Sequence, residues 1–284
     1  MYYNIDNKMA AMQSENHSKT IRIEAIDPAF SEHLWQVTTY GSSAVYTKQL
    51  HHDMTRPDLF VITGISSKSF MGTAHVIMST LHTIENKYHR VHIIKFCHTK
   101  NNIKDMQEKA CAKRDKMKLD EKYINVEPKT AHDTPVRKWV SNRNEVFKPE
   151  IDFYILCAKL VNHIIINMKL TNVEVIGKCA GGCIAIHLIT MNPNCTALYL
   201  GSPGSPNFVE PLKKLDRDRL TSMKFYFGWP SNDTYQFMWG IAIDDKSTYD
   251  MMMEQFGVLH YKSRIYSEFG HELHPDMICD ICLY

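Results

Sequence analysis

Short apolar runs alternate with segments of helical hydrophobic spacing along most of the chain. The runs rich in β-branched and aromatic residues predict strands at 20–26, 34–40, 58–64, 91–96, 173–177, 196–200, 223–227 and 261–269. Apolar positions three and four residues apart predict helices at about 70–88, 151–169, 181–191, 208–221, 247–256 and from about 272. A polar loop is expected from 41 to 53. Such alternation is typical of an α/β fold, so we expect a doubly wound, mostly parallel sheet with helices on both faces.

Two segments depart from this alternation. Residues 1–20 are polar and predict a flexible N-terminal tail, which leaves 21–284 as one α/β domain. Within that domain, residues 100–148 carry 13 Lys and Arg residues against 8 Asp and Glu residues. This charged segment is either a solvated helix followed by a long surface loop, or a lid that attracts anions to a site.

Composition narrows the class of protein. A hydrophobic content of 44% and a charged content of 23% are usual for globular proteins and argue against a wholly disordered chain. A net charge of +2 gives no support for a nucleic-acid partner. No apolar run is long enough to span a membrane, and the first residues lack the apolar core of a signal peptide. We therefore expect a cytoplasmic protein whose eight cysteines are reduced.

The most informative stretch is Gly177-Lys-Cys-Ala-Gly-Gly182, which lies between a predicted strand and a predicted helix. Gly177 stands two residues before Cys179, and Gly181 stands two residues after it. This is the spacing of a nucleophile elbow, a strained turn whose glycines avoid clashes with crossing backbone. The helix N-terminus favours a thiolate, so Cys179 is a candidate nucleophile. Lys178 is expected to be a solvated neighbour whose charge would also lower the pKa of the thiol.

An elbow nucleophile needs a general base and an acid that orients the base. In elbow enzymes both partners follow the nucleophile along the chain. Asp233 is the candidate acid because it follows a late predicted strand and a Gly/Pro turn, and Asp244 and Asp245 are its rivals. His271 is the candidate base because it follows the last predicted strand, and His274 is the second choice.

An oxyanion hole would complete the site. One donor is expected from the backbone N–H of Ala180, directly after the nucleophile. The other is expected from the loop after an earlier strand, where Gly64-Ile65-Ser66 stands. The N–H of Ile65 or of Ser66 is therefore the second candidate donor.

At this point the chain resembles the α/β-hydrolase superfamily, from about Leu34 to its end. Its box at 177–182 looks most like that of dienelactone hydrolases, which carry a Cys in the elbow with Asp and His partners; polyhydroxyalkanoate synthases share a similar box. The resemblance implies an acyl-enzyme on Cys179, proton transfer by His271, and Asp233 holding the imidazole. It implies no particular substrate, because no Arg or Glu of this chain can be assigned to the carboxylate pocket of dienelactone hydrolases.

The expected function is therefore hydrolysis of an ester, a lactone or a thioester, with a small-molecule acyl substrate and no cofactor. Two alternatives stay open. One is an acyltransferase of the same fold, with an alcohol or a thiol as acceptor. The other is a non-catalytic protein that uses the fold for binding. The sequence leaves the oligomeric state open.

The end of the chain offers a competing set of soft-metal ligands, namely His271, His274, Cys279 and Cys282. Only four residues separate the two pairs, far fewer than in the usual zinc sites. Ligands on one helix would not converge on a tetrahedral ion, so no metal is expected. Cys183, one helical turn after the elbow, is expected in the core rather than as a disulfide or resolving partner.

Overall fold

The computed structural model describes residues 35–40, 43–64, 67–96, 134–203, 206–231, 245–267 and 270–284, with the backbone alone at 67–68, 134–150, 206–208, 245 and 247–248. The chain divides into two units, and each is considered by itself. The main unit comprises Met1–Cys97 and Ala158–Tyr284, and the second comprises His98–Cys157. The predicted tail at 1–20 and strand at 20–26 lie outside the described residues. The charged segment 100–148 falls within the second unit, and its assignment as an insertion or lid stays a prediction.

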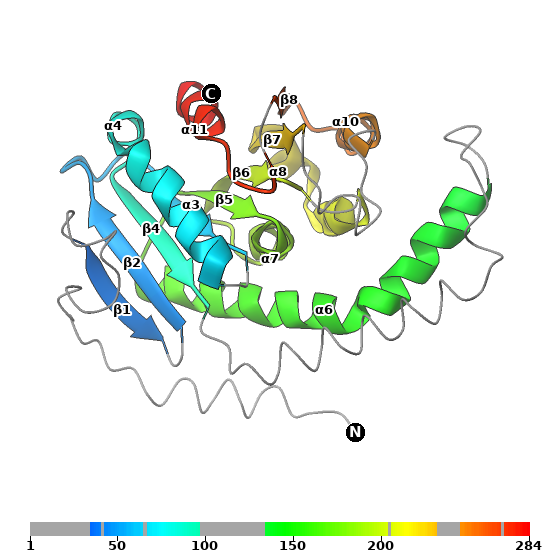
Figure 1. Cartoon of the computed structure of the whole chain (residues 1–284), viewed down its shortest axis with the longest axis horizontal. Helices are drawn as coiled ribbons and strands as arrows, with labels where there is room; N and C mark the ends of the chain where they lie inside the picture. The colour runs from blue at the N-terminus through cyan, green and yellow to red at the C-terminus, as the bar shows by residue number, and fades with distance from the viewer. Residues whose placement is uncertain are drawn as a thin grey trace. The chain divides into compact units, whose positions relative to one another are not determined.

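The main unit is built on one eight-stranded sheet (Figure 1). Its strands are β1 (Gln36–Tyr40), β2 (Ser43–Gln49), β3 (Asp58–Ile62), β4 (Arg90–Lys95), β5 (Val173–Lys178), β6 (Cys195–Gly201), β7 (Lys224–Pro230) and β8 (His260–Tyr266). They lie in the order β1-β2-β4-β3-β5-β6-β7-β8. Only β2 pairs antiparallel, with β1 and β4 on its two sides, and all other pairs are parallel. The predicted mostly parallel sheet is confirmed.

Helices cover both faces of this sheet. The described helices are α3 (Ser67–Ser79), α4 (Leu81–Ile84), α6 (Thr134–Asn167), α7 (Ala180–Met191), the 3₁₀-helix η3 (Pro206–Lys214), α8 (Arg217–Ser222), α10 (Asp245–Gln255) and α11 (Pro275–Leu283). Side chains of α3, α4 and α11 share one apolar cluster with Tyr199 of β6. Leu200, the next residue, points to the opposite face and lies beside Gly182 of α7. The predicted arrangement of helices on both faces is therefore confirmed.

The apolar runs of the central strands explain why this sheet is buried. Every residue of β3 and of β5 is buried, and their neighbours on both sides are parallel strands. Strands covered by helices on both faces need apolar side chains in both directions, and β-branched residues suit them. Because β3, β5, β6 and β7 are parallel neighbours, their carboxyl ends meet at one edge of the sheet. The residues of the candidate site follow at this edge.

Several predicted elements differ from the structure. The polar loop expected at 41–53 contains the strand β2, whose sequence has no clear alternation of apolar and polar residues. The helix expected at 70–88 is broken after Ser79, where the Thr80 hydroxyl donates to the Val76 carbonyl at 2.8 Å. The helix expected at 208–221 is instead η3 followed by the short helix α8.

The helix α6 also differs from its predicted range, because it begins at Thr134 and runs through Pro149. A proline inside a helix removes a donor and usually ends the helix, which is why the sequence predicts a start only after it. The part of α6 within the main unit buries Ala158, Val161, Ile164 and Ile165. Among the described residues, no helix is both long and apolar enough to cross a membrane.

Candidate active site

Cys179 occupies the sharp turn between β5 and α7. Its backbone has φ 55° and ψ −124°, a conformation that L-residues other than glycine rarely adopt. The turn is held by its own backbone: the Cys179 N–H donates to the Gly201 carbonyl at 3.1 Å, and the Gly182 N–H donates to the Cys179 carbonyl at 2.8 Å. Strain of this kind persists only when the surroundings hold it in place, and it presents the side chain at the end of the strand.

The two predicted elbow glycines lie where no side chain fits. A Cβ on Gly177 would stand 2.6 Å from the Gly182 Cα. A Cβ on Gly181 would stand 2.6 Å from the Thr63 carbonyl oxygen and still closer to that of Ile62. The contacts are with backbone, so they cannot be relieved by rotating a side chain. The glycine spacing in the sequence thus reflects two close approaches of the chain, one within the turn and one to the end of β3.

The thiol of Cys179 lies against the imidazole of His271. Burial opposes ionisation of this thiol, but a hydrogen bond with His271 and the positive charges of His271 and Lys178 outweigh it. The Ala180 N–H also donates to the sulfur. The pKa of Cys179 consequently lies below its ordinary value. A partly exposed cysteine with such neighbours has the character of a reactive thiol rather than of an inert core thiol.

His271 comes from the segment between β8 and α11, ninety-two positions after the cysteine it meets. His274, the second choice for the base, has another role. Its Nδ1 accepts a hydrogen bond from the Asp276 N–H at 3.1 Å and so caps the N-terminus of α11. Its ring stacks on Tyr266 at a centroid distance of 4.6 Å. The structure therefore brings His271, and not His274, to the thiol.

The remaining predicted site residues fall mainly outside the described part of the chain. Ile65 and Ser66, the candidates for the second oxyanion donor, are not among the described residues. Neither are the candidate acid Asp233 and its rival Asp244, while Asp245 is the first residue of α10. Their roles, like those of Cys179, His271 and Ala180, stay predictions.

Lys178 is the clearest correction at the site. It was expected in solvent, yet it is only 2% exposed. Its ammonium lies 3.5 Å from the Ser69 hydroxyl of α3 and 3.5 Å from the Glu272 carboxylate. The sequence contained one signal for this burial, because Lys178 directly follows the buried strand predicted at 173–177 and the strand in the structure extends to it. Glu272 had a weaker signal, its position beside His271, and Ser69 had none.

The competing metal site is not assembled. Among the described residues, no group of three or more His, Cys, Asp or Glu side chains could hold a metal ion. His271 contacts Cys179, His274 caps a helix, and Cys279 lies 4.0 Å from the Thr83 hydroxyl. Cys183 is buried in α7, and neither it nor Cys179 forms a disulfide.

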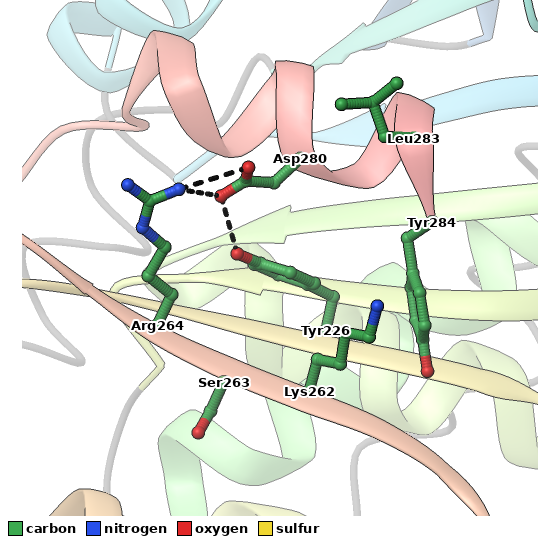
Figure 2. Close-up of a pocket in the computed structure, with 7 residues that line it drawn as sticks. All are labelled: Tyr226, Lys262, Ser263, Arg264, Asp280, Leu283 and Tyr284. Atoms are coloured by element: carbon green, nitrogen blue, oxygen red, sulfur yellow. Dashed lines mark hydrogen bonds and ion pairs between the residues drawn. The ribbon is translucent and has the colours of Figure 1, made fainter.

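A separate pocket of about 460 Å³ lies between β7, β8 and α11 (Figure 2). None of its lining residues belongs to the candidate site. Figure 2 shows that Asp280 of α11 accepts hydrogen bonds from Tyr226 and Arg264, at 2.8 Å and 2.9 Å. Tyr266 donates to the same carboxylate at 2.6 Å. These bonds tie α11 to the two last strands and so support the segment that carries His271.

Comparison with solved structures places this architecture among known folds. A CIB-like hydrolase from Thermoplasma acidophilum matches with a TM-score of 0.51 and 12% identity, over 87% of this chain and 94% of that one. The protein TT1662 from Thermus thermophilus matches with a TM-score of 0.50 and 10% identity, over 88% and 96%. The naproxen esterase of Bacillus subtilis gives a TM-score of 0.49 at 11% identity, over 100% and 98%.

The chain has the α/β-hydrolase fold. The strand order, the single antiparallel strand inside the sheet and the turn after β5 agree with it. At identities near 10% the likeness extends to the fold alone, and the activity of a neighbour does not transfer with it. No protein-family model matches the chain, and no curated protein matches its sequence.

Proposed function

We propose that this α/β-hydrolase-fold protein cleaves small-molecule acyl substrates, an ester, a lactone or a thioester, through a covalent intermediate on Cys179. The observation that carries the proposal is the hydrogen bond between the Cys179 thiol and the His271 ring at a strained turn. A thiol with a lowered pKa beside an imidazole supports a thiolate–imidazolium pair at neutral pH.

The reaction has two halves. The Cys179 sulfur attacks the substrate carbonyl, and the negative oxygen of the tetrahedral intermediate accepts the Ala180 N–H, which donates to the sulfur at rest. A second donor is proposed from Ile65 or Ser66. His271 gives its proton to the leaving group as the bond to the carbonyl carbon breaks, and Asp233 is proposed to orient the imidazole.

Water completes the cycle. His271 takes a proton from a water molecule whose oxygen attacks the thioester carbonyl of the acyl-enzyme. The bond between the acyl carbon and sulfur then breaks, which releases the acid and restores the thiolate. If an alcohol or a thiol replaced water in this half, the same residues would catalyse acyl transfer.

The first test is the rate at which iodoacetamide alkylates each cysteine as a function of pH, measured by peptide mass spectrometry. Cys179 should react rapidly with an inflection below the usual thiol range, and His271→Ala should remove that advantage. Cys282 is an internal control because burial raises the pKa of its thiol to about 11. If Cys179 reacts no faster than a thiol of the unfolded chain, the catalytic proposal is wrong. That result would favour a non-catalytic protein that uses the fold for binding.

The second test uses an activated p-nitrophenyl ester. A burst of one p-nitrophenolate per chain, with the acyl group found on Cys179, supports covalent catalysis. Decay of the isolated acyl-enzyme in water alone supports a hydrolase. Decay that requires an added alcohol or thiol supports the acyltransferase instead. Cys179→Ser, which keeps the shape but not the thiol, should show no burst at neutral pH.

A further inference from the structure

A buried lysine beside the thiol is the most unusual charge of the described main unit. Lys178 ends β5 with its side chain 3% exposed, whereas Glu272 is 43% exposed on its side of the pair. Burying an ammonium costs several kcal/mol unless partners compensate it, and an apolar side chain would fill a strand position more cheaply. Retention of such a charge next to a reactive group therefore calls for an explanation beyond packing.

The partners of this lysine come from two other elements. Glu272, in the segment before α11, places its carboxylate 3.5 Å from the Lys178 ammonium. Ser69, in α3, places its hydroxyl 3.5 Å from the same ammonium. Gly72 of α3 faces the same carboxylate, since a Cβ there would stand 2.6 Å from the Glu272 oxygen. A glycine at this position leaves room for the carboxylate to reach the lysine.

The ion pair and the thiol–imidazole contact are formed by adjacent residues. Lys178 precedes Cys179, and Glu272 follows His271, so two dipeptides meet through two contacts side by side. The contact between Lys178 and Glu272 therefore brings Cys179 and His271 together, and the reverse also holds. Among the described residues, the charged groups that lower the pKa of the thiol are His271 and Lys178, and Glu272 contacts Lys178 at 3.5 Å.

We propose that Lys178 and Glu272 are positioning residues of the site, whose ion pair holds His271 against Cys179 while the buried ammonium stabilises the thiolate. The inference rests on the proposed function, in which Cys179 reacts as a thiolate and His271 moves the proton. The two residues have separable effects. Lys178 supplies charge to the thiol, and Glu272 supplies the connection that keeps the imidazole in place and balances the buried charge.

The test compares Lys178→Met, Glu272→Gln and the double variant in two measurements on the full chain. The first is the pH profile of Cys179 alkylation, and the second is the burst rate with the p-nitrophenyl ester. Lys178→Met should move the alkylation inflection to higher pH, and each unit of movement lowers the rate below the inflection about tenfold. Glu272→Gln should move the inflection less than Lys178→Met does, because the ammonium remains beside the thiol. It should still slow the burst at least tenfold, because the imidazole loses the ion pair that holds it in place.

The double variant tests whether the pair acts as a unit. Its burst rate should equal that of Lys178→Met, because Glu272 has no ion-pair partner left once Lys178 is replaced. If a single variant unfolds, the double variant can still be measured, because it leaves no uncompensated charge of this pair in the site. The matched control is the exposed pair Lys213 and Glu210, joined at 2.7 Å, whose Met and Gln variants should change neither measurement.

Failure of the positioning roles and failure of the proposed function give different results. Slow alkylation of Cys179 in the unmodified chain would sink the proposed function. Fast alkylation that keeps its inflection in Lys178→Met, with an unchanged burst in Glu272→Gln, would overturn the positioning roles and leave the function standing. Multiplicative losses in the double variant would show two independent residues rather than a pair. Far-UV circular dichroism and thermal unfolding verify that every compared variant is folded.

Discussion

Two neighbouring glycines at the start of α7 should respond to alanine in opposite ways. Gly181→Ala would push a methyl group into the backbone of β3, 2.6 Å from the Thr63 carbonyl oxygen and 2.8 Å from the Ile62 carbonyl carbon. Gly182→Ala would place its methyl 3.4 Å from Leu200 Cδ2 and 3.7 Å from the Gly177 carbonyl oxygen, which are ordinary contacts. Neither glycine has a positive φ, so alanine can adopt both backbone conformations.

The expected magnitudes follow from these distances. Overpacking against atoms that cannot rotate away costs about 1–3 kcal/mol, and the Gly181 contacts argue for the upper end. At Gly182 the methyl group fits, and alanine restricts the unfolded chain more than glycine does. That substitution should therefore stabilise the protein by about 0.4–1 kcal/mol.

Urea unfolding followed by far-UV circular dichroism measures both changes as shifts of the midpoint at constant slope. The midpoint should fall for Gly181→Ala and rise for Gly182→Ala. Alkylation of Cys179 should slow in the former, because β3 and the turn must separate to admit the methyl group. Equal destabilisation by both variants, or none by Gly181→Ala, would refute the reasoning from close approach.

Three further predictions concern charges and caps. Glu174→Gln should lower the free energy of unfolding by about 3 kcal/mol in urea titration, because the buried carboxylate accepts from Tyr88 at 2.6 Å and pairs with Lys87 at 2.9 Å; a loss below 1 kcal/mol would contradict this. Burial tends to raise the pKa of Asp58, but the His92 ring 3.6 Å away and the hydrogen bonds from Arg90 lower it from 3.8 to about 2. This depressed pKa contributes about 2 kcal/mol of stability that is present above pH 3.8 and is lost as the pH falls towards 2, so acid titration of Asp58→Asn should lack that loss. His274→Ala should cost about 1 kcal/mol through the lost cap of α11 and leave the alkylation of Cys179 fast, whereas slow alkylation would return His274 to the candidates for the base.

Local backbone requirements explain why half of the candidate site could be predicted. A strained turn needs glycines at fixed offsets, and these are visible as Gly177 and Gly181 around Cys179. The chain order of the fold then directs attention to a histidine after the last strand. His271 does meet the thiol in the structure, although its catalytic role and that of Asp233 await experiment.

Elements that depend on distant partners were harder to predict. The sequence predicts a loop where β2 lies, because this mixed sequence is stabilised by pairing with β1 and β4 and not by a continuous apolar run. The extension of α6 through Pro149 contradicts the local preference of proline. In both cases the local signal was weak or opposite to the outcome, and contacts elsewhere decided it.

By itself, the sequence determined the alternation of strand and helix, the buried central strands and the glycine-flanked cysteine, since each depends on residues close together in the chain. Only the tertiary structure decided which histidine reaches the thiol and that Lys178 is buried with Glu272. The reason is physical: a lysine at the end of a strand is solvated or buried according to what packs over it. Here Ser69 of α3, 109 residues earlier in the chain, and Glu272 of the segment before α11, 94 residues later, enclose it.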